Sequence, residues 1–195
     1  MHIHRLLSVS LLACMASASL AQFDASKVAR VPEPVAKRYP DPVVNYGTPS
    51  LREGRADFAS HDEVLAFLRA MAQTHGPSVR LEIIGKSQQA RDIPLVLLSD
   101  SGIFQPGKPT VLILGQQHGN EPAGGEAGLA LIEQLATVQR GMLKHVNVLI
   151  MPKANPDGAQ NFVRATASGL DVNRDHLLLQ TPEAISIAKT ALKYS

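Results

Sequence analysis

Tryptophan is absent from this sequence of 195 residues, cysteine occurs once, and aromatic residues make up only 4% of the chain. So few aromatic side chains provide no platform on which nucleic acid bases would stack. The formal net charge is +2, so the chain also lacks the strongly basic character that attracts a phosphate backbone. Both absences argue against a nucleic acid partner.

Long hydrophobic runs are equally scarce. The apolar segment from Leu6 to Met15 is too short to cross a bilayer as a helix, so we expect no transmembrane segment. Basic and histidine residues precede it and the small residues Ser19-Leu20-Ala21 follow it, which is typical of a secretory signal peptide. We predict a signal peptide over residues 1–21, cleaved after Ala21, and export to the periplasm or the extracellular space.

The one cysteine, Cys14, has two alternative fates. Cleavage after Ala21 would remove it, and the mature chain would then have no disulfide although its compartment would allow one. In the alternative, Leu12-Ala13-Cys14 is a lipoprotein cleavage site and Cys14 becomes acylated. The small residues that end at Ala21 favour the first alternative.

The remaining composition fits a single globular domain. A hydrophobic fraction of 45% is ordinary, and 195 residues are enough for one core. Residues 22–58 contain closely spaced prolines, which disfavour both helices and central strands. These prolines are Pro32, Pro34, Pro40, Pro42 and Pro49. We therefore predict an extended lead-in over residues 22–58, followed by a folded domain over residues 59–195.

Within the folded domain, helical and strand patterns alternate. A capping box at Ser60 to Glu63 begins a helix that should end near Gly76. Strands are predicted over residues 79–84, 93–98, 110–114 and 146–151, and further helices over residues 122–139 and 184–193. This order predicts an α/β fold in which a mixed sheet carries helices on both faces.

Within the folded domain, residues 152–178 form a long stretch without a regular pattern, and loops of this length are usually functional. In open α/β sheets, ligands collect at the carboxyl ends of the strands. The segments that follow residue 114 and residue 151 both leave strands at that end. We therefore expect these two loops to face each other.

The first of these loops contains His118 and Glu121, three positions apart, and Pro122 suits the first turn of the following helix. An imidazole and a carboxylate at this spacing can both reach one ion, and zinc accepts nitrogen and oxygen ligands of these types. The spacing alone is not specific, because a surface histidine beside a helix-capping glutamate would look the same.

The second loop contains Asn155-Pro-Asp-Gly158, Arg164, and the pair Asn173 and Arg174. The planar guanidinium group of arginine binds carboxylates through two parallel hydrogen bonds. An arginine beside a metal can also stabilise a developing oxyanion. Arg164 and Arg174 are therefore candidates for substrate binding. Alternatively, they are solvated loop arginines and Asn155 forms a turn.

Taken together, these motifs resemble those of the zinc carboxypeptidases of the carboxypeptidase A/B type. Order and spacing both match for His118-Gly-Asn-Glu121, Asn155-Pro-Asp-Gly158, Arg164 and Asp171-Val-Asn173-Arg174, and the resemblance runs from about Ser60 to the last residue. It implies a phosphorylase/hydrolase-like α/β sandwich. It also implies hydrolytic removal of the C-terminal residue of a peptide.

The resemblance assigns roles to five residues. His118 and Glu121 correspond to two of the three ligands of a catalytic zinc ion, whose bound water would attack the peptide bond. Arg164 corresponds to the arginine that polarises the scissile carbonyl and holds the oxyanion. Asn173 and Arg174 correspond to the pair that binds the terminal carboxylate of the peptide substrate.

The sequence departs from the family pattern after Arg174. The family has a third zinc ligand, a histidine, and a general-base glutamate further along the chain, with a tyrosine near the substrate. His176 lies where the family usually has an aromatic residue and is poorly placed to bind the same ion, and Glu183 falls in the first turn of a helix. We therefore expect the N-terminal part of a catalytic domain, truncated before the site is complete and inactive by itself.

Three alternatives remain open. A zinc deacylase of the aspartoacylase and succinylglutamate desuccinylase type resembles this chain in the H-G-N-E loop and the D-x-N-R segment. A cell-wall peptide amidase within the carboxypeptidase family would suit an exported protein. A non-catalytic module would bind peptide carboxylates through Arg164 and Arg174 without cleaving them.

Overall fold

The computed structural model describes residues 31–40 and 45–195. The predicted signal peptide, its cleavage position and Cys14 lie outside these residues. Within the described ranges, four strands form one mixed sheet in the spatial order β1-β2-β4-β3. The strands are β1 (Val79–Lys86), β2 (Asp92–Leu98), β3 (Thr110–Leu114) and β4 (Asn147–Met151).

Pairing within the sheet is antiparallel except between β3 and β4. The hairpin of β1 and β2 is antiparallel, and so is the pair of β2 and β4. Strands β3 and β4 run parallel, with Thr110 opposite Asn147 and Leu114 opposite Met151. The central strands β2 and β4 are buried along almost their whole length, as expected for apolar strands that are covered on both faces.

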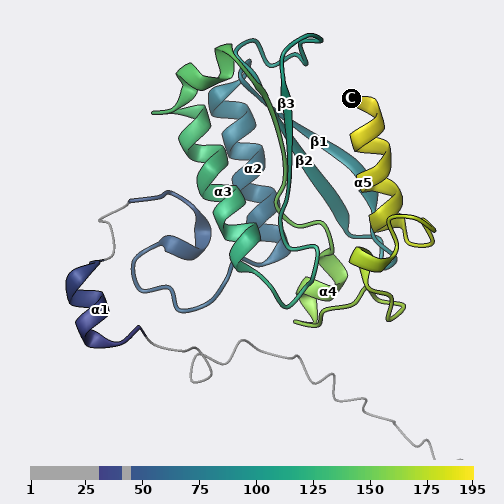
Figure 1. Ribbon diagram of the computed structural model, residues 1–195, viewed down its shortest axis with the longest axis horizontal. Coiled ribbons are helices and arrows are strands. Elements are labelled where there is room, and N and C mark those ends of the chain that lie inside the picture. Colours follow the sequence, from purple (N-terminus) through teal and green to yellow (C-terminus); the bar gives the residue numbers. More distant parts are fainter. Residues whose placement is uncertain (1–30, 41–44) are drawn as a thin grey trace, which may run out of the picture.

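Helices cover both faces of the sheet, as the sequence predicted (Figure 1). They are α2 (His61–His75) and α3 (Ala123–Ala136) on one face and α5 (Pro182–Lys193) on the other. Successive side chains of a strand point to opposite faces. Val96 and Ile150 therefore join the core beneath α2 and α3, whereas Leu95 and Leu149 join the core beneath α5. No helix in the described part of the chain is long and apolar enough to cross a bilayer.

Local hydrogen bonds begin helix α2 as predicted. The Ser60 hydroxyl accepts from the main-chain N–H of Glu63 (3.3 Å), and the Ser60 N–H donates to Glu63 Oε2 (2.8 Å). This reciprocal pair is the predicted capping box. The helix ends at His75, with Gly76 as its C-cap, which also agrees with the prediction.

Other bounds differ from the prediction in detail. Helix α3 ends at Ala136 rather than near residue 139, because Thr137 leaves the helical conformation and its hydroxyl donates to the carbonyl of Glu133 (2.7 Å). The chain then forms a 3₁₀ helix, η3 (Arg140–Lys144). Strand β1 runs two residues further than predicted, because its pairing with β2 continues to its last residue.

The long loop after β4 contains two short helices that the sequence prediction missed. Helix α4 (Pro156–Gln160) begins where Asn155 Oδ1 accepts from the N–H of Gly158 (2.9 Å). The 3₁₀ helix η4 (Val172–Arg174) is capped in the same way by the side chain of Asp171. Such side chain to main chain bonds create no apolar periodicity, so periodicity predicted an irregular stretch.

In its described residues, 31–40 and 45–58, the predicted lead-in is not extended throughout. A short exposed helix, α1 (Glu33–Arg38), contradicts the prediction that prolines exclude a helix there. Pro34 is tolerated because it lies in the first turn, where the missing N–H needs no partner within the helix. Further on, a 3₁₀ turn η2 (Pro49–Leu51) follows Gly47, whose N–H donates to the carboxylate of Glu133 on α3 (2.8 Å). The domain boundary at residue 58 stays a prediction.

A buried carboxylate joins helix α4 to the turn between β1 and β2. Asp157 is fully buried, and its Oδ1 accepts from the Ser87 hydroxyl and from Arg91 Nη1, both at 2.7 Å. Its Oδ2 accepts from the main-chain N–H of Gln89 (2.8 Å). Because all these partners come from the turn, the start of the long loop is fixed to the edge of the sheet.

Glu183, in the first turn of α5, is buried as well. The N–H of Gln88 donates to its Oε1 (3.3 Å), whereas Oε2 has no hydrogen-bond partner among the described residues. Burial raises the pKa of Glu183, the N–H of Gln88 opposes this in part, and the charges of Asp157 and Asp175 raise it further. The folded state therefore favours the protonated acid.

Glu183 should make the stability of the fold depend on pH. Because its pKa is raised in the folded state, its contribution is complete below the ordinary glutamate pKa and is lost as the pH rises through the folded-state value. We expect the Tm to fall by a few degrees as the pH rises from the ordinary glutamate pKa through the folded-state pKa, and Glu183→Gln to remove part of that fall. Thermal unfolding followed by circular dichroism checks this, with the exposed Glu53→Gln as the control. The same pH dependence in wild type and Glu183→Gln would show that Glu183 does not cause it.

Candidate metal and substrate site

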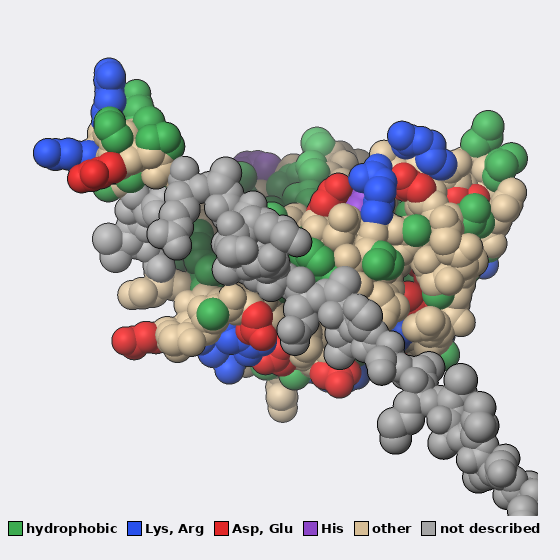
Figure 2. All heavy atoms as spheres, turned by 90° about the horizontal axis from the view of Figure 1, so that it is seen from below, with side chains coloured by type: hydrophobic (Ala, Val, Ile, Leu, Met, Phe, Trp, Pro, Cys, Tyr) green, Lys and Arg blue, Asp and Glu red, His purple; other side chains and the backbone are tan. Residues whose placement is uncertain are grey.

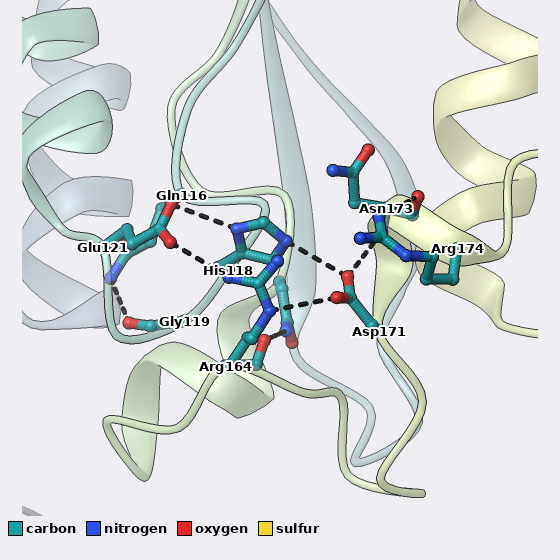
Figure 3. A network of polar contacts seen from close by, with 9 residues as sticks. Gln116, His118, Gly119, Glu121, Arg164, Asp171, Asn173 and Arg174 are labelled. Atoms are coloured by element: carbon teal, nitrogen blue, oxygen red, sulfur yellow. Dashed lines mark hydrogen bonds and ion pairs between the residues drawn. The ribbon is translucent and has the colours of Figure 1, made fainter.

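The loops after β3 and β4 lie against each other at one end of the sheet (Figure 3). Parallel pairing brings the carboxyl ends of both strands to the same edge. Main-chain bonds then join the loops, from Ala154 N–H to the carbonyl of Gly115 (3.1 Å) and from Gly119 N–H to the carbonyl of Arg164 (3.4 Å). The prediction that these loops face each other is confirmed. Figure 2 shows the molecule from this end, where acidic, basic and histidine side chains lie close together.

The first loop requires a glycine at position 119. A Cβ atom there would lie 1.9 Å from the carbonyl carbon of Gly158, which is main chain and cannot move aside. The buried Gln116 supports the same turn, since its Nε2 donates to the carbonyl of Gly119 (2.9 Å). The main chain on either side of His118 is therefore fixed by packing against helix α4.

The two predicted metal ligands point toward one another. His118 Nδ1 lies 3.0 Å from Glu121 Oε2. On its other side, His118 Nε2 lies 3.1 Å from Asp171 Oδ1, in the second loop. The imidazole thus lies between two carboxylates that are 50 residues apart in the sequence, since 171 − 121 = 50.

This arrangement is suited to a cation. A neutral imidazole has one N–H and one lone pair, so it donates to only one of the two carboxylates. The other contact then brings a nitrogen lone pair against a carboxylate oxygen, which is repulsive unless a proton or a metal ion lies between them. If Nε2–H donates to Asp171, then Nδ1 and Glu121 present a nitrogen and an oxygen donor to the same point.

Asp171 is a site residue to which the sequence analysis gave no role. Its Oδ1 accepts from the main-chain N–H of Asn173 (2.8 Å), and its Oδ2 accepts from Arg164 Nε (3.0 Å). Burial tends to raise the pKa of Asp171, but these donors and the nearby His118 outweigh it and hold the pKa below the ordinary value. The signal was present in the D-x-N-R segment, because a carboxylate commonly orients a ligating histidine.

Arg164 connects the two loops from the solvent side. Its Nη1 lies 3.3 Å from Glu121 Oε1, and its Nε bonds to Asp171. The guanidinium side chain is 46% exposed, so it borders the site without being enclosed by it. A cation in this position can meet a substrate oxygen that approaches His118 from outside.

Asn173 and Arg174 lie on the far side of Asp171 (Figure 3). Both residues are exposed, and Arg174 Nη1 donates to the carbonyl of Asn173 (3.1 Å). Their place follows from the cap of η4, because the bond from Asn173 N–H to Asp171 ties this pair to the carboxylate that holds His118. The structure thus brings all five predicted site residues to one end of the sheet.

The donors fit part of a zinc site. His118 and Glu121 provide a nitrogen and an oxygen of the kinds that zinc accepts. In residues 31–40 and 45–195, no group of three or more histidine, cysteine, aspartate or glutamate side chains is arranged to hold a metal ion. The loop after β4 contains one histidine, His176, and this residue is exposed. The described chain therefore offers two convergent donors.

Comparisons with known proteins identify the family to which the chain belongs. The sequence model of the family described as zinc carboxypeptidase matches residues 64–187. Probable carboxypeptidase 2 of Trichophyton verrucosum is 33% identical over 144 residues, which is 70% of this chain and 28% of that protein. Carboxypeptidase D of Mus musculus is 33% identical over 154 residues, which is 69% of this chain and 11% of that protein.

Solved structures give the same fold. A metallo-carboxypeptidase from Burkholderia cenocepacia matches with a TM-score of 0.63 and 24% identity, over 70% of this chain and 39% of that one. The chain thus spans 28% of the Trichophyton verrucosum protein and 39% of the Burkholderia cenocepacia structure. The matched part nevertheless includes both loops of the site, and the chain belongs to the zinc carboxypeptidase family, a family of hydrolytic enzymes.

Proposed function

We propose that this chain carries the zinc-binding loop and the carboxylate-binding loop of a metallocarboxypeptidase that removes C-terminal residues from peptides. The observation that carries the proposal is the contact set of His118, which lies between Glu121 and Asp171 with Arg164 beside both carboxylates. Because the chain spans 28% of a matched carboxypeptidase, the activity of the whole enzyme is part of the proposal.

His118 and Glu121 would hold the zinc ion, and Asp171 would orient the histidine. Accepting a hydrogen bond from Nε2–H keeps Nδ1 unprotonated and makes the imidazole a better donor. The chemistry that zinc supplies in such a site is Lewis acidity and activation of water. A third ligand and a general base are needed for that chemistry, and the described residues contain no cluster of three side chains arranged to hold a metal ion.

Arg164 would act on the substrate carbonyl. Its guanidinium group lies within ion-pair distance of Glu121, so it faces the same space as the two donors. As negative charge develops on the carbonyl oxygen, a fixed cation in that place lowers the energy of the transition state. Asn173 and Arg174 would bind the terminal carboxylate, where an exposed guanidinium can approach both oxygens.

Export to the periplasm or the extracellular space belongs to the same proposal. It rests on the N-terminal charged and apolar segments followed by Ser19-Leu20-Ala21. The family match favours a peptidase over the zinc deacylase alternative. The peptide amidase alternative falls within the matched family, and peptide substrates with different C-terminal residues would separate it from a carboxypeptidase.

The non-catalytic alternative has one specific observation in its favour, the absence of a third arranged ligand from the described residues. Peptide binding that survives chelation, without turnover when zinc is added, would favour this alternative. Binding that requires zinc would favour the peptidase.

The purified chain should bind zinc weakly, through His118 and Glu121. Two protein ligands leave a zinc site open and of low affinity compared with three. We expect His118→Ala and Glu121→Ala each to abolish the binding, measured by competition with a chromophoric chelator, and the exposed His145→Ala to leave it unchanged. Tight binding of one zinc ion per chain, or zinc-dependent cleavage by the purified chain, would mean that a third ligand exists within these residues.

Asp171→Asn should weaken zinc binding without removing a ligand. The amide still fills the space, but it accepts the Nε2–H hydrogen bond less strongly, and changes of this kind lower metal affinity about ten- to a hundredfold. The same competition assay measures the effect. An affinity equal to that of the wild type would show that Asp171 does not orient His118.

Arg174→Ala should weaken binding of peptides with a free C-terminal carboxylate by about tenfold, the effect of losing a charge-assisted hydrogen bond. Isothermal titration calorimetry with a free-acid peptide and its C-terminal amide measures this. The amide should bind both proteins equally. Arg69→Ala, an exposed arginine on α2, is the matched control. Equal losses for the acid and the amide would contradict a role in carboxylate recognition.

A further inference from the structure

The turn between β1 and β2 is bonded to the loop that carries Asp171. Gln88 Nε2 donates to the hydroxyl of Ser168 (2.8 Å), and the main-chain N–H of Ser168 donates to Gln88 Oε1 (2.8 Å). Both ends of the Gln88 amide therefore bond to one residue, 80 positions away in the sequence. Neither residue is among the five predicted site residues.

Bonds to two buried acidic side chains fix the main chain at Gln88. Asp157 accepts from the Ser87 hydroxyl (2.7 Å) and from the N–H of Gln89 (2.8 Å), the residues on either side of Gln88. The N–H of Gln88 itself donates to Glu183 (3.3 Å). Because this main chain is already ordered, the bonds that the Gln88 side chain makes cost only its own rotamer freedom.

Ser168 lies within a closed turn, residues 166–170. Its base is formed by Thr166, whose main-chain N–H and hydroxyl both donate to the carbonyl of Leu170, at 2.8 and 3.1 Å. These bonds fix the shape of the turn. The two bonds from Ser168 to Gln88 fix its position relative to β1 and β2.

Two site residues flank this turn. Arg164 precedes it and Asp171 follows it, and Arg164 Nε donates to Asp171 Oδ2 (3.0 Å). Asp171 Oδ1 lies 3.1 Å from His118 Nε2. Residues 167–170 are exposed, so packing restrains this part of the turn little. A displacement of the turn would therefore move the carboxylate that contacts both the histidine and the guanidinium.

We propose that Gln88 is a positioning residue of the candidate site, which holds the turn of residues 166–170 so that the Asp171 carboxylate stays against His118 and Arg164. Gln88 acts through these residues and not by contact with substrate or metal. The inference rests on the proposed function for the role of zinc, but the positioning itself is a property of the zinc-free chain.

Exchange of the Arg164 Nε–H proton with water tests the proposal without zinc. This exchange is slowed while the proton is bonded to Asp171, and proton–nitrogen NMR spectra of the full chain measure it. Gln88→Met keeps the length of the side chain but removes both polar atoms. It should accelerate the exchange about two- to tenfold, the range expected for the loss of one hydrogen bond. Unchanged exchange in this variant overturns the proposal.

Gln89→Met is the matched control, because Gln89 is an exposed glutamine of the same turn whose side chain bonds to Arg91 instead (2.7 Å). It should leave the exchange unchanged. Gln88→Glu should keep the exchange slow, because a carboxylate can accept from both the N–H and the hydroxyl of Ser168. Equal acceleration in Gln89→Met, or a failure of Gln88→Glu to keep the exchange slow, would contradict the proposal.

Ser168→Ala alters the same contact from the other side. It removes the hydroxyl and leaves the N–H, so the exchange at Arg164 should be faster than in the wild type and slower than in Gln88→Met. This variant decides the question if Gln88→Met fails to fold, since wild-type exchange in Ser168→Ala would then overturn the proposal.

Zinc affinity separates positioning through Asp171 from a general structural effect. In the chelator competition assay, Gln88→Met should lower the affinity about two- to tenfold, and it should have no further effect in Asp171→Asn, where His118 is already held less well. An equal loss in both backgrounds would show that Gln88 does not act through Asp171. If the chain binds no zinc, the proposed function fails, and the exchange at Arg164 still decides the role of Gln88.

Discussion

The parallel pairing of β3 with β4 is the interaction on which the site depends. It aligns Leu114 with Met151, so that both strands end at the same level of the sheet. The pairing continues past the strands, because Gly115 N–H donates to the carbonyl of Met151 (2.7 Å) and Ala154 N–H donates to the carbonyl of Gly115 (3.1 Å). Each loop therefore starts from a fixed position beside the other. Without this pairing, the two loops would not be held side by side, and His118 would not lie next to Asp171.

Charges at this end of the sheet are arranged in opposed pairs. His118 and Arg164 lie between the carboxylates of Glu121 and Asp171, and the charges of Glu126 and Glu63 act on the buried Lys153. Buried or half-buried ionic groups stabilise a fold poorly, because desolvation offsets much of their attraction. Their concentration at the end of the sheet where the two loops meet, beside a core that is otherwise apolar, fits a region that binds rather than one that stabilises the fold.

Most of the fold could be predicted from the sequence, because apolar periodicity follows the faces that are buried. The strands and the helices on both faces were recognisable in this way, and the capping box at Ser60 was recognisable from its residue types and spacing. The helices that the sequence analysis did not predict have local causes. Helix α4 depends on the side chain of Asn155, and helix α1 tolerates Pro34 because that proline lies in its first turn. Neither feature depends on an apolar pattern, so periodicity gave no sign of them.

The sequence by itself determined which residue types are available for chemistry and at what spacing, from His118 and Glu121 to Asn173 and Arg174. These features are local, because each motif lies within one short segment of the sequence. Only the tertiary structure decided that Asp171 holds His118, and that the buried Asp157 fixes the turn from which Gln88 reaches Ser168. The physical reason is that burial and contacts between distant residues are properties of packing.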